Sequence, residues 1–345
     1  MNQGRRLHIH LILTVVVILI SGHVCGQAGA GMKIGQGDQA YKDSLRKAGY
    51  PYHFPIWGKK AVQKGINLQY PVGAMLNLNY GTQDVNITDL QVGFNDHDPV
   101  PMDFIKFGAV QAKMQSVTSR VDLWLLPFID VYAIGGYVQA TTAVNIVAPF
   151  NFSSETKFKG STFGLGTTLA GGYHGIITIT DINHTWTNLD KLDQLVKTWM
   201  ITPRLGYNFI FKNNPDRSFA VWLGTTGFFV NRNTVGSIDL SDLNPQMNKD
   251  QLEKIVAETE QWYQGLTKPQ QVVVKGLAQG ILNKMNNLPD DITVHYSLKK
   301  RPTSQWSMLA GGQFQFTKRW QVRTEIGFLG GRSSVLLSGN YRWRW

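Results

Sequence analysis

The chain contains 345 residues with a formal net charge of +11; 17% of them are charged, 11% are aromatic and 35 are glycine. After residue 30 no apolar run approaches the roughly 18 residues that a membrane-spanning helix needs, which excludes a helical membrane protein. The lysines and arginines form no compact run, so the positive charge does not predict nucleic-acid binding.

Residues 1–30 have the layout of a secretory signal peptide. Arg5 and Arg6 precede an apolar run over 7–20, and small residues follow it. The run is too short to cross a bilayer as a helix, which takes about 20 apolar residues. We therefore expect export across the inner membrane and removal of this segment.

Cys25, the one cysteine, lies near the end of that segment. It is either lost with the signal peptide or, in the alternative, the acylated cysteine of a lipoprotein. Gly22 and Val24 stand where lipoprotein signals usually carry leucine and a small residue, which favours loss. A mature chain without Cys25 has neither a disulfide nor a cysteine-ligated metal site.

Residues 31–70 form a separate N-terminal segment. Residues 43–48 suit a helical turn, whereas Pro51 and Pro55 predict irregular structure. We expect this segment in the periplasm or tucked into the mouth of the domain that follows.

Residues 71–345 show the period of two that is typical of a membrane β-barrel. Successive side chains face lipid and lumen in turn, so each strand alternates for about 10 residues. The alternation predicts an all-β protein, a transmembrane antiparallel up-and-down β-barrel of about ten strands, with twelve as the alternative. The expected strands are 74–92, 105–126, 130–147, 160–172, 174–187, 197–211, 218–239, 291–316, 319–328 and 333–345.

The predicted connections are of two kinds. Those near 93–104, 148–159, 188–196 and 240–290 are long, and they alternate with tight turns, except that the last outer turn, 329–332, is also short. Because outer-membrane barrels have short periplasmic turns and longer extracellular loops, the long connections are expected outside the cell.

The long connection contains a helical insertion over 243–290. Apolar residues recur at helical spacing in two stretches, 252–266 and 273–285, with a capping pattern and Pro269 between them. This predicts an extracellular helical hairpin. Trp262 and Tyr263 are its candidate surface residues for docking a partner; the alternative, which we favour, is that they form the core of the hairpin.

No catalytic or metal-binding pattern is present. The histidines after the signal peptide do not fall into the arrangements of barrel phospholipases or proteases, and no metal-ligand spacing occurs. We therefore expect a protein that is not an enzyme and has no cofactor, with an outer-membrane lipid hydrolase as a disfavoured alternative.

The polar faces of the strands carry the candidate lumen residues. They either pair across a filled interior or line an anion-favouring constriction, and the modest strand number favours a filled interior. These candidates are Arg120, Asp122, Arg204, Arg323, Glu325, Arg342 and Arg344.

The chain ends on Tyr341, Trp343 and Trp345, at alternate positions of the last strand. This ending resembles the C-terminal aromatic signal of Gram-negative outer-membrane barrels, with tryptophan in place of the commoner phenylalanine. The resemblance implies location in the outer membrane and recognition by the barrel-assembly machinery. Lipid and lipopolysaccharide are then the surrounding partners, and basic residues could contact lipopolysaccharide phosphates.

Several further phrases are similar to an uncharacterised family of outer-membrane proteins that brings no known activity with it. These phrases are 70–73, 121–128, 203–207, 262–266 and 340–342. We expect a non-enzymatic barrel that is a narrow channel or a small-molecule transport protein. The alternative is a surface binding or adhesion protein that displays the helical hairpin.

Overall fold

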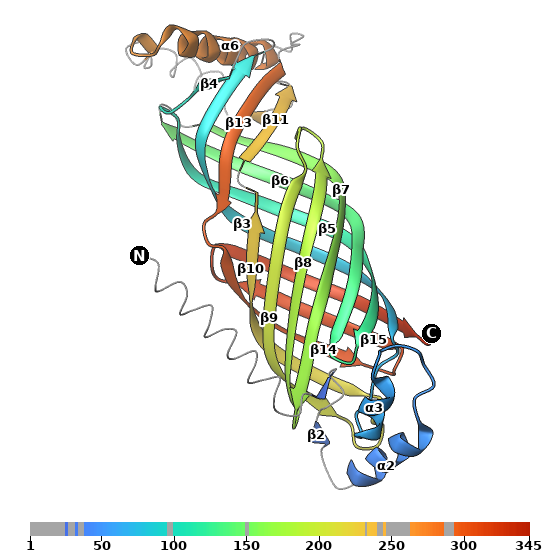
Figure 1. The fold of residues 1–345 in the computed structure, drawn as a ribbon. Coiled ribbons are helices and arrows are strands. Elements are labelled where there is room, and N and C mark those ends of the chain that lie inside the picture. Colours follow the sequence, from blue (N-terminus) through green and yellow to red (C-terminus); the bar gives the residue numbers. More distant parts are fainter. Residues whose placement is uncertain are drawn as a thin grey trace, which may run out of the picture.

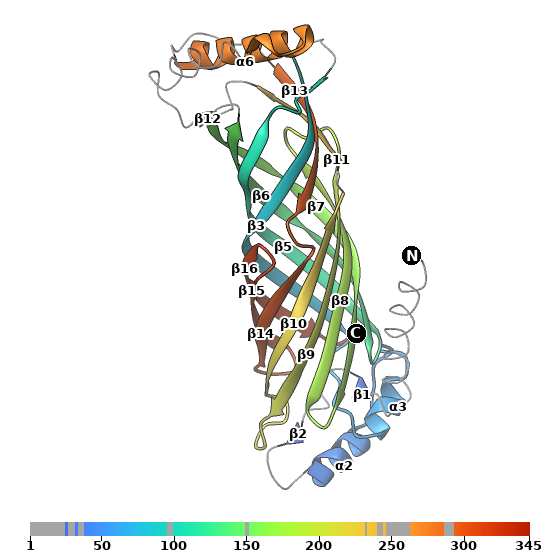
Figure 2. The same cartoon turned by 90° about the vertical axis from the view of Figure 1, so that its left-hand side faces the viewer.

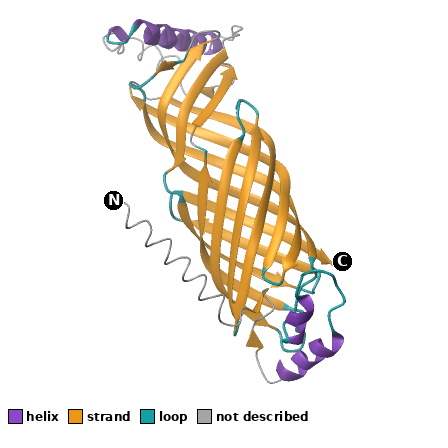
Figure 3. Cartoon of the chain, in the orientation of Figure 1, coloured by secondary structure: helices purple, strands orange, loops and turns teal. Residues whose placement is uncertain are grey.

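The computed structural model describes residues 25–26, 32–33, 38–94, 99–148, 152–231, 233–239, 244–245, 263–285 and 293–345. Most of them belong to one closed antiparallel barrel, with the helices confined to its two ends (Figures 1 and 3). No helix among these residues is long and apolar enough to cross a membrane.

Ten strands close the barrel, as the alternation predicts. Each pairs with its neighbour in the chain, and the first strand pairs with both the second and the last. The ten are β3 (Val72–Phe94), β5 (Lys106–Leu126), β6 (Ile129–Ala148), β7 (Phe152–Tyr173), β8 (Ile176–Leu189), β9 (Val196–Ile210), β10 (Ser218–Val230), β14 (Trp306–Gln315), β15 (Trp320–Phe328) and β16 (Arg332–Trp343).

The outer surface of the barrel is apolar over a band and aromatic at both edges of that band. Leu78, Leu165, Leu205, Leu223 and Leu337 are each at least 45% exposed. The upper edge is formed by Tyr80, Tyr137, Phe163, Trp199 and Trp306, and the lower edge by Tyr173, Phe211, Phe219, Phe316 and Trp320. An apolar band between two aromatic girdles, on an even number of antiparallel strands, is the surface of an outer-membrane barrel.

Above the upper girdle the barrel continues as an extension out of the membrane. The turn at 329–331 stops β15 and β16 early, and β13 (Thr293–Pro302) takes the place of β16 beside β3: Arg332 pairs with Gln83, whereas Pro302 pairs with Val85. β11 (Asn233–Asp239) pairs with β13 on its other side. Figure 1 shows β3, β13 and β11 rising together at the upper end.

The apolar face changes side between the membrane and the extension. On β5 the membrane part points Val117 and Val121 outward, but above the girdle Val110 and Met114 line the interior while Lys113 is exposed. Where lipid surrounds the barrel, its outer face is apolar; where water surrounds it, the apolar side chains lie on the inner face instead. The extension therefore has an apolar interior.

One expected loop is absent. β7 begins at Phe152, and its residues up to Ser161 pair with β6, so the predicted long loop 148–159 is a short connection and the prediction was wrong there. Ser153 and Lys157 look like loop residues, but they belong to the extension, where the outer face meets water. Thr156 between them is buried and faces the interior.

The helical insertion lies at the end of the barrel opposite the C-terminus (Figure 2). Its second helix, α6 (Lys268–Met285), is present as predicted; most of the first predicted helix, 252–266, falls outside the described residues. Val273 is buried against Val92, Met102 and Val294, next to the short strand β4 (Val100–Pro101). The short strand β12 (Asn244–Pro245) pairs with β7.

The N-terminal segment lies at the C-terminal end of the barrel and contacts its mouth. Its helices α2 (Asp38–Ala48) and α3 (Gly58–Gln63) are followed by a stretch that enters β3, and a small core forms around Tyr50, Val62 and Leu68. The Ile56 amide donates to the Leu125 carbonyl, and the Gln69 amide to Gln315 Oε1. Two short strands, β1 (Cys25–Gly26) and β2 (Met32–Lys33), pair with β7 and β9.

Candidate functional site

A layer of paired charges crosses the lower half of the lumen. Arg120 on β5 binds Asp130 on β6, donates to Thr168 Oγ1 at 3.0 Å and lies 3.6 Å from Asp181 on β8. The Arg120 guanidinium also lies over the Tyr132 ring, 3.6 Å from its centroid. One arginine thus joins three neighbouring strands across the interior.

The far side of this layer is built around Arg204 on β9. Its Nη1 donates to Asp181 at 2.6 Å and its Nε to Glu325 at 2.7 Å. Glu325 also accepts from the Trp222 indole at 3.0 Å and from Arg323 Nε at 3.0 Å. Every polar group here is tied to a partner on another strand or to a neighbour on its own.

Arg342 closes the layer at the seam between the last and first strands. It donates to Asp122 Oδ2 at 2.7 Å and to the carbonyl oxygens of Tyr70 at 2.7 Å and Pro71 at 3.2 Å. The layer thereby holds four arginines and four carboxylates, a balance that leaves no net charge: Arg120, Arg204, Arg323 and Arg342 against Asp122, Asp130, Asp181 and Glu325.

The layer fills the lumen at its level. Asp122, Asp130, Arg204 and Arg342 are all less than 7% exposed. Because each charge is paired and no charged side chain of the layer is more than 12% exposed, this region has the character of a packed interior rather than of a charged constriction.

Six of the seven sequence-derived lumen candidates lie in this layer, and Arg344 does not. Arg344 is exposed beyond the end of β16, where its guanidinium donates to the Tyr70 hydroxyl at 3.2 Å. The expectation that Arg344 faces the lumen is therefore corrected: the last strand ends at Trp343, so the alternation stops before Arg344.

Four members of the layer were not singled out from the sequence: Asp130, Tyr132, Asp181 and Trp222. Asp130 could have been found, because it is the second residue of β6, next to the turn after β5. The sequence does not indicate which face of its strand carries Asp181, because β8 is apolar on both faces, with Ile176 53% exposed and Ile177 1% exposed.

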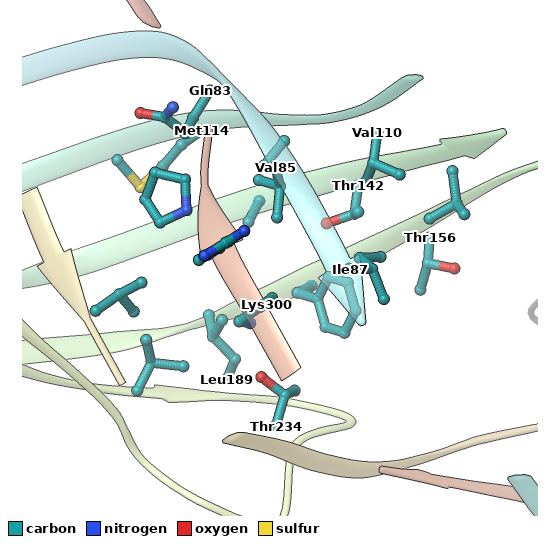
Figure 4. Close-up of a pocket in the computed structure, with 18 of the residues that line it drawn as sticks. Gln83, Val85, Ile87, Val110, Met114, Thr142, Thr156, Leu189, Thr234 and Lys300 are labelled. Atoms are coloured by element: carbon teal, nitrogen blue, oxygen red, sulfur yellow. The ribbon is translucent and has the colours of Figure 1, made fainter. Parts of the chain in front are cut away.

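Above the layer, the extension contains a partly open, apolar cavity of about 290 Å³. This volume lies near the lower end of the range of small-molecule sites, roughly 300–1,000 Å³. Figure 4 shows side chains from β3, β5, β6, β7 and β13 around it, among them Ile87, Val110, Met114, Thr142 and Lys300. Leu189, Val196 and Phe228 complete the wall from β8, β9 and β10.

The basic residues of the cavity wall have no acidic counterpart. Lys300, Arg301 and Arg332 line the cavity, and no aspartate or glutamate of the described chain does. Arg332 lies with its guanidinium over the Phe228 ring, 4.8 Å from the centroid, and its Nη1 is buried without a hydrogen-bond partner.

Of the two candidate docking residues in the insertion, Trp262 and Tyr263, the structure describes only Tyr263. Trp262 lies outside the described residues. Tyr263 is half-buried, and its hydroxyl donates to the Gln271 carbonyl of α6 at 3.2 Å. Tyr263 thus contacts its own hairpin.

The residues predicted as the barrel-assembly signal lie at the lower rim. Tyr341 packs against Trp320, with ring centroids 4.8 Å apart, and against Trp343. Trp345 is 68% exposed and lies near Phe54 of the N-terminal segment.

Among known proteins no family model matches this chain. No curated protein matches it either. Solved structures with a similar fold include the outer membrane protein OprG from Pseudomonas aeruginosa, with 9% identity, 80% of this chain and 99% of that chain covered, and a TM-score of 0.38. The transport unit of the autotransporter AIDA-I from Escherichia coli is 10% identical; the match covers 89% of this chain and 98% of that chain, with a TM-score of 0.34. The CymD monoaromatic hydrocarbon channel is 8% identical; the match covers 92% of this chain and 95% of that chain, with a TM-score of 0.22.

Proposed function

We propose that this outer-membrane barrel is a small-molecule transport protein that takes a largely apolar molecule into the chamber above its ionic layer. It is not an enzyme and not an open ion pore in this proposal. The apolar cavity of about 290 Å³ in the extension carries the proposal. A cavity lined by apolar side chains with a few polar groups is the usual form of a small-molecule site.

The ionic layer supports the second half of the proposal. A hydrated ion passing down the lumen would have to separate buried pairs such as Arg204 with Asp181 and Arg342 with Asp122. Breaking a buried pair is costly, about 3–5 kcal/mol when one partner is lost. The resting barrel is therefore expected to conduct no steady current, and passage of a solute requires the layer to rearrange.

Binding of 1-octanol to the protein in lipid nanodiscs tests this proposal, with empty nanodiscs as the baseline. Ala140 lines the cavity from β6, so Ala140→Phe should fill part of it and weaken octanol binding at least tenfold. Ala143 is three residues along the same strand and points to the other face, so Ala143→Phe is the matched control and should bind normally. Equal binding by both variants, or none above empty nanodiscs by the native protein, would contradict the proposal.

The display alternative has less support. α6 packs onto the barrel tip through Val273, and Tyr263 is engaged within the hairpin. Among residues 263–276, the part of the insertion whose side chains the structure describes, Val272 is the large apolar side chain that is strongly exposed, at 59%. A single exposed valine is ordinary on a protein surface.

We also propose lipopolysaccharide and the barrel-assembly machinery as partners. Lys113 on β5 and Lys157 on β7 are exposed on the same rung, with Thr141 of β6 between them. They point outward just above the upper girdle, where lipopolysaccharide phosphates would meet them. The aromatic residues at the end of β16 supply the recognition signal for assembly.

A further inference from the structure

The charges of the cavity wall differ from those of the ionic layer below. In the layer every arginine has a carboxylate partner. In the wall, Lys300 and Arg332 have no such partner among the described residues. Acidic residues do occur in this part of the fold, as the adjacent residue Lys299 shows. Lys299 points outward and pairs with Asp89 at 2.7 Å.

Both cations approach the cavity from one side. Arg332 begins β16 opposite Gln83, and Lys300 on β13 lies opposite Ile87, so the two occupy the same edge of β3 one above the other. Figure 4 shows Lys300 among the apolar side chains of the wall, near Ile87 and Leu189. Arg301 also borders the cavity but is exposed to solvent.

An unpaired cation in apolar surroundings is unfavourable in the absence of a ligand. Burial lowers the pKa of Lys300, and no carboxylate opposes that shift. In the ionic layer a carboxylate lies opposite each arginine, but no described carboxylate lies opposite these two groups. Buried charge without a partner is a feature of binding sites, where the ligand supplies the missing group.

We propose that the molecule bound in the chamber is an amphipathic anion: an apolar chain or ring with a single carboxylate that is held by Lys300 and Arg332. This inference rests on the proposed function and names its substrate class. The apolar body would lie against side chains such as Val110, Met114 and Phe228. A guanidinium presents two parallel N–H groups to a carboxylate, and an ammonium adds a point charge.

Paired probes with the same chain test the inference: sodium octanoate and 1-octanol, titrated calorimetrically into the protein in nanodiscs at neutral pH. Octanoate should bind about 10- to 100-fold more tightly than octanol, the equivalent of one charge-assisted hydrogen bond. Lys300→Met and Arg332→Met should each weaken octanoate binding about tenfold and leave octanol binding unchanged.

The chain offers a matched control for Lys300. Lys299→Met removes the same charge one residue away on the outer face, and it should leave octanoate binding unchanged. Lys300→Arg keeps the charge and should retain most of the affinity. Heat-modifiable migration of each variant on a gel verifies that the barrel is closed.

The outcomes separate the two proposals. If octanol and octanoate bind equally and Lys300→Met changes neither, the anion inference is wrong while the apolar chamber stands. If Lys299→Met weakens octanoate as much as Lys300→Met does, the effect is one of general surface charge and the inference is also wrong. If neither probe binds above empty nanodiscs, the proposed function itself is wrong.

Discussion

Arg204 illustrates how single residues hold the lumen closed. It connects β9 to β8 through Asp181 and, across the interior, to β15 through Glu325. In an interior of low polarity, an ion pair contributes little over an apolar pair of the same shape, but a single charge left alone is strongly unfavourable. The layer is therefore sensitive to the loss of one member.

Arg204→Met is expected to lower the free energy of unfolding by about 3–5 kcal/mol, because Glu325 loses one of its two guanidinium partners in a buried site. Urea titration of the protein refolded in micelles measures this. The double variant Arg204→Met with Glu325→Gln should recover much of the loss, because three arginines then face three carboxylates and the charges of the layer balance again. A single variant as stable as the native protein would show that water already reaches the layer.

Lys300→Met is expected to have the opposite effect on stability. Without ligand it removes a cation that has no partner in the described structure, which should raise the free energy of unfolding by about 1–3 kcal/mol. The same urea titration measures this, with Lys299→Met as the comparison. If Lys300→Met is more stable than the native protein but binds octanoate more weakly, Lys300 serves ligand binding rather than folding.

At the scale of elements, α6 is attached to the barrel tip through a small apolar cluster. Val273 is 3% exposed in that cluster, whereas its neighbour Val272 is 59% exposed. The Gln270 side chain adds a hydrogen bond to the Pro101 carbonyl at 2.9 Å. One face of the first turns of α6 therefore holds the insertion in place.

Val273→Asp should release α6 from the tip, because it forfeits about 1.5–3 kcal/mol of apolar burial and places a charge in the cluster. Tryptic cleavage after the exposed Lys275 should then become much faster. Val272→Asp is the matched control and should be cleaved at the native rate. Equal rates for both variants would mean that the cluster does not hold the helix.

The strands could be predicted from the sequence because lipid imposes the alternation directly on each of them. The start of β7 could not, because Ser153 to Lys157 are polar and became a strand only by pairing with β6 above the membrane. The pairs of the ionic layer also depend on which strands face each other across the lumen: Arg204 and Glu325 are 121 residues apart. Likewise, Lys300 could be recognised as unpaired only once its surroundings were known.

For the whole molecule, the decisive boundary is the upper girdle, where the apolar face passes from the outside of the wall to the inside. Leu337 and Ser333 lie on the outer face of β16 on either side of this boundary, and both are exposed. The structure thus assigns them different surroundings, lipid for Leu337 and the membrane edge for Ser333.

Leu337→Arg should reduce the free energy of folding into bilayers by about 2–4 kcal/mol, the cost of arginine near the membrane midplane. Ser333→Arg should cost about 0–1 kcal/mol, because its charge reaches the interface. Urea titration in lipid vesicles measures both. Similar costs for the two variants would place the membrane boundary elsewhere on the barrel.

The seam between β3 and β16 has a consequence for the order of events in folding. It joins Val72 to Trp343, so its two edges come from opposite ends of the barrel sequence, and Arg342 also reaches Asp122 on β5. Contacts between such distant parts of a chain form slowly, because a large loop must first close. The contacts of Arg342 should therefore be among the last to form, and a chain that lacks them would stay an unclosed sheet with two free edges.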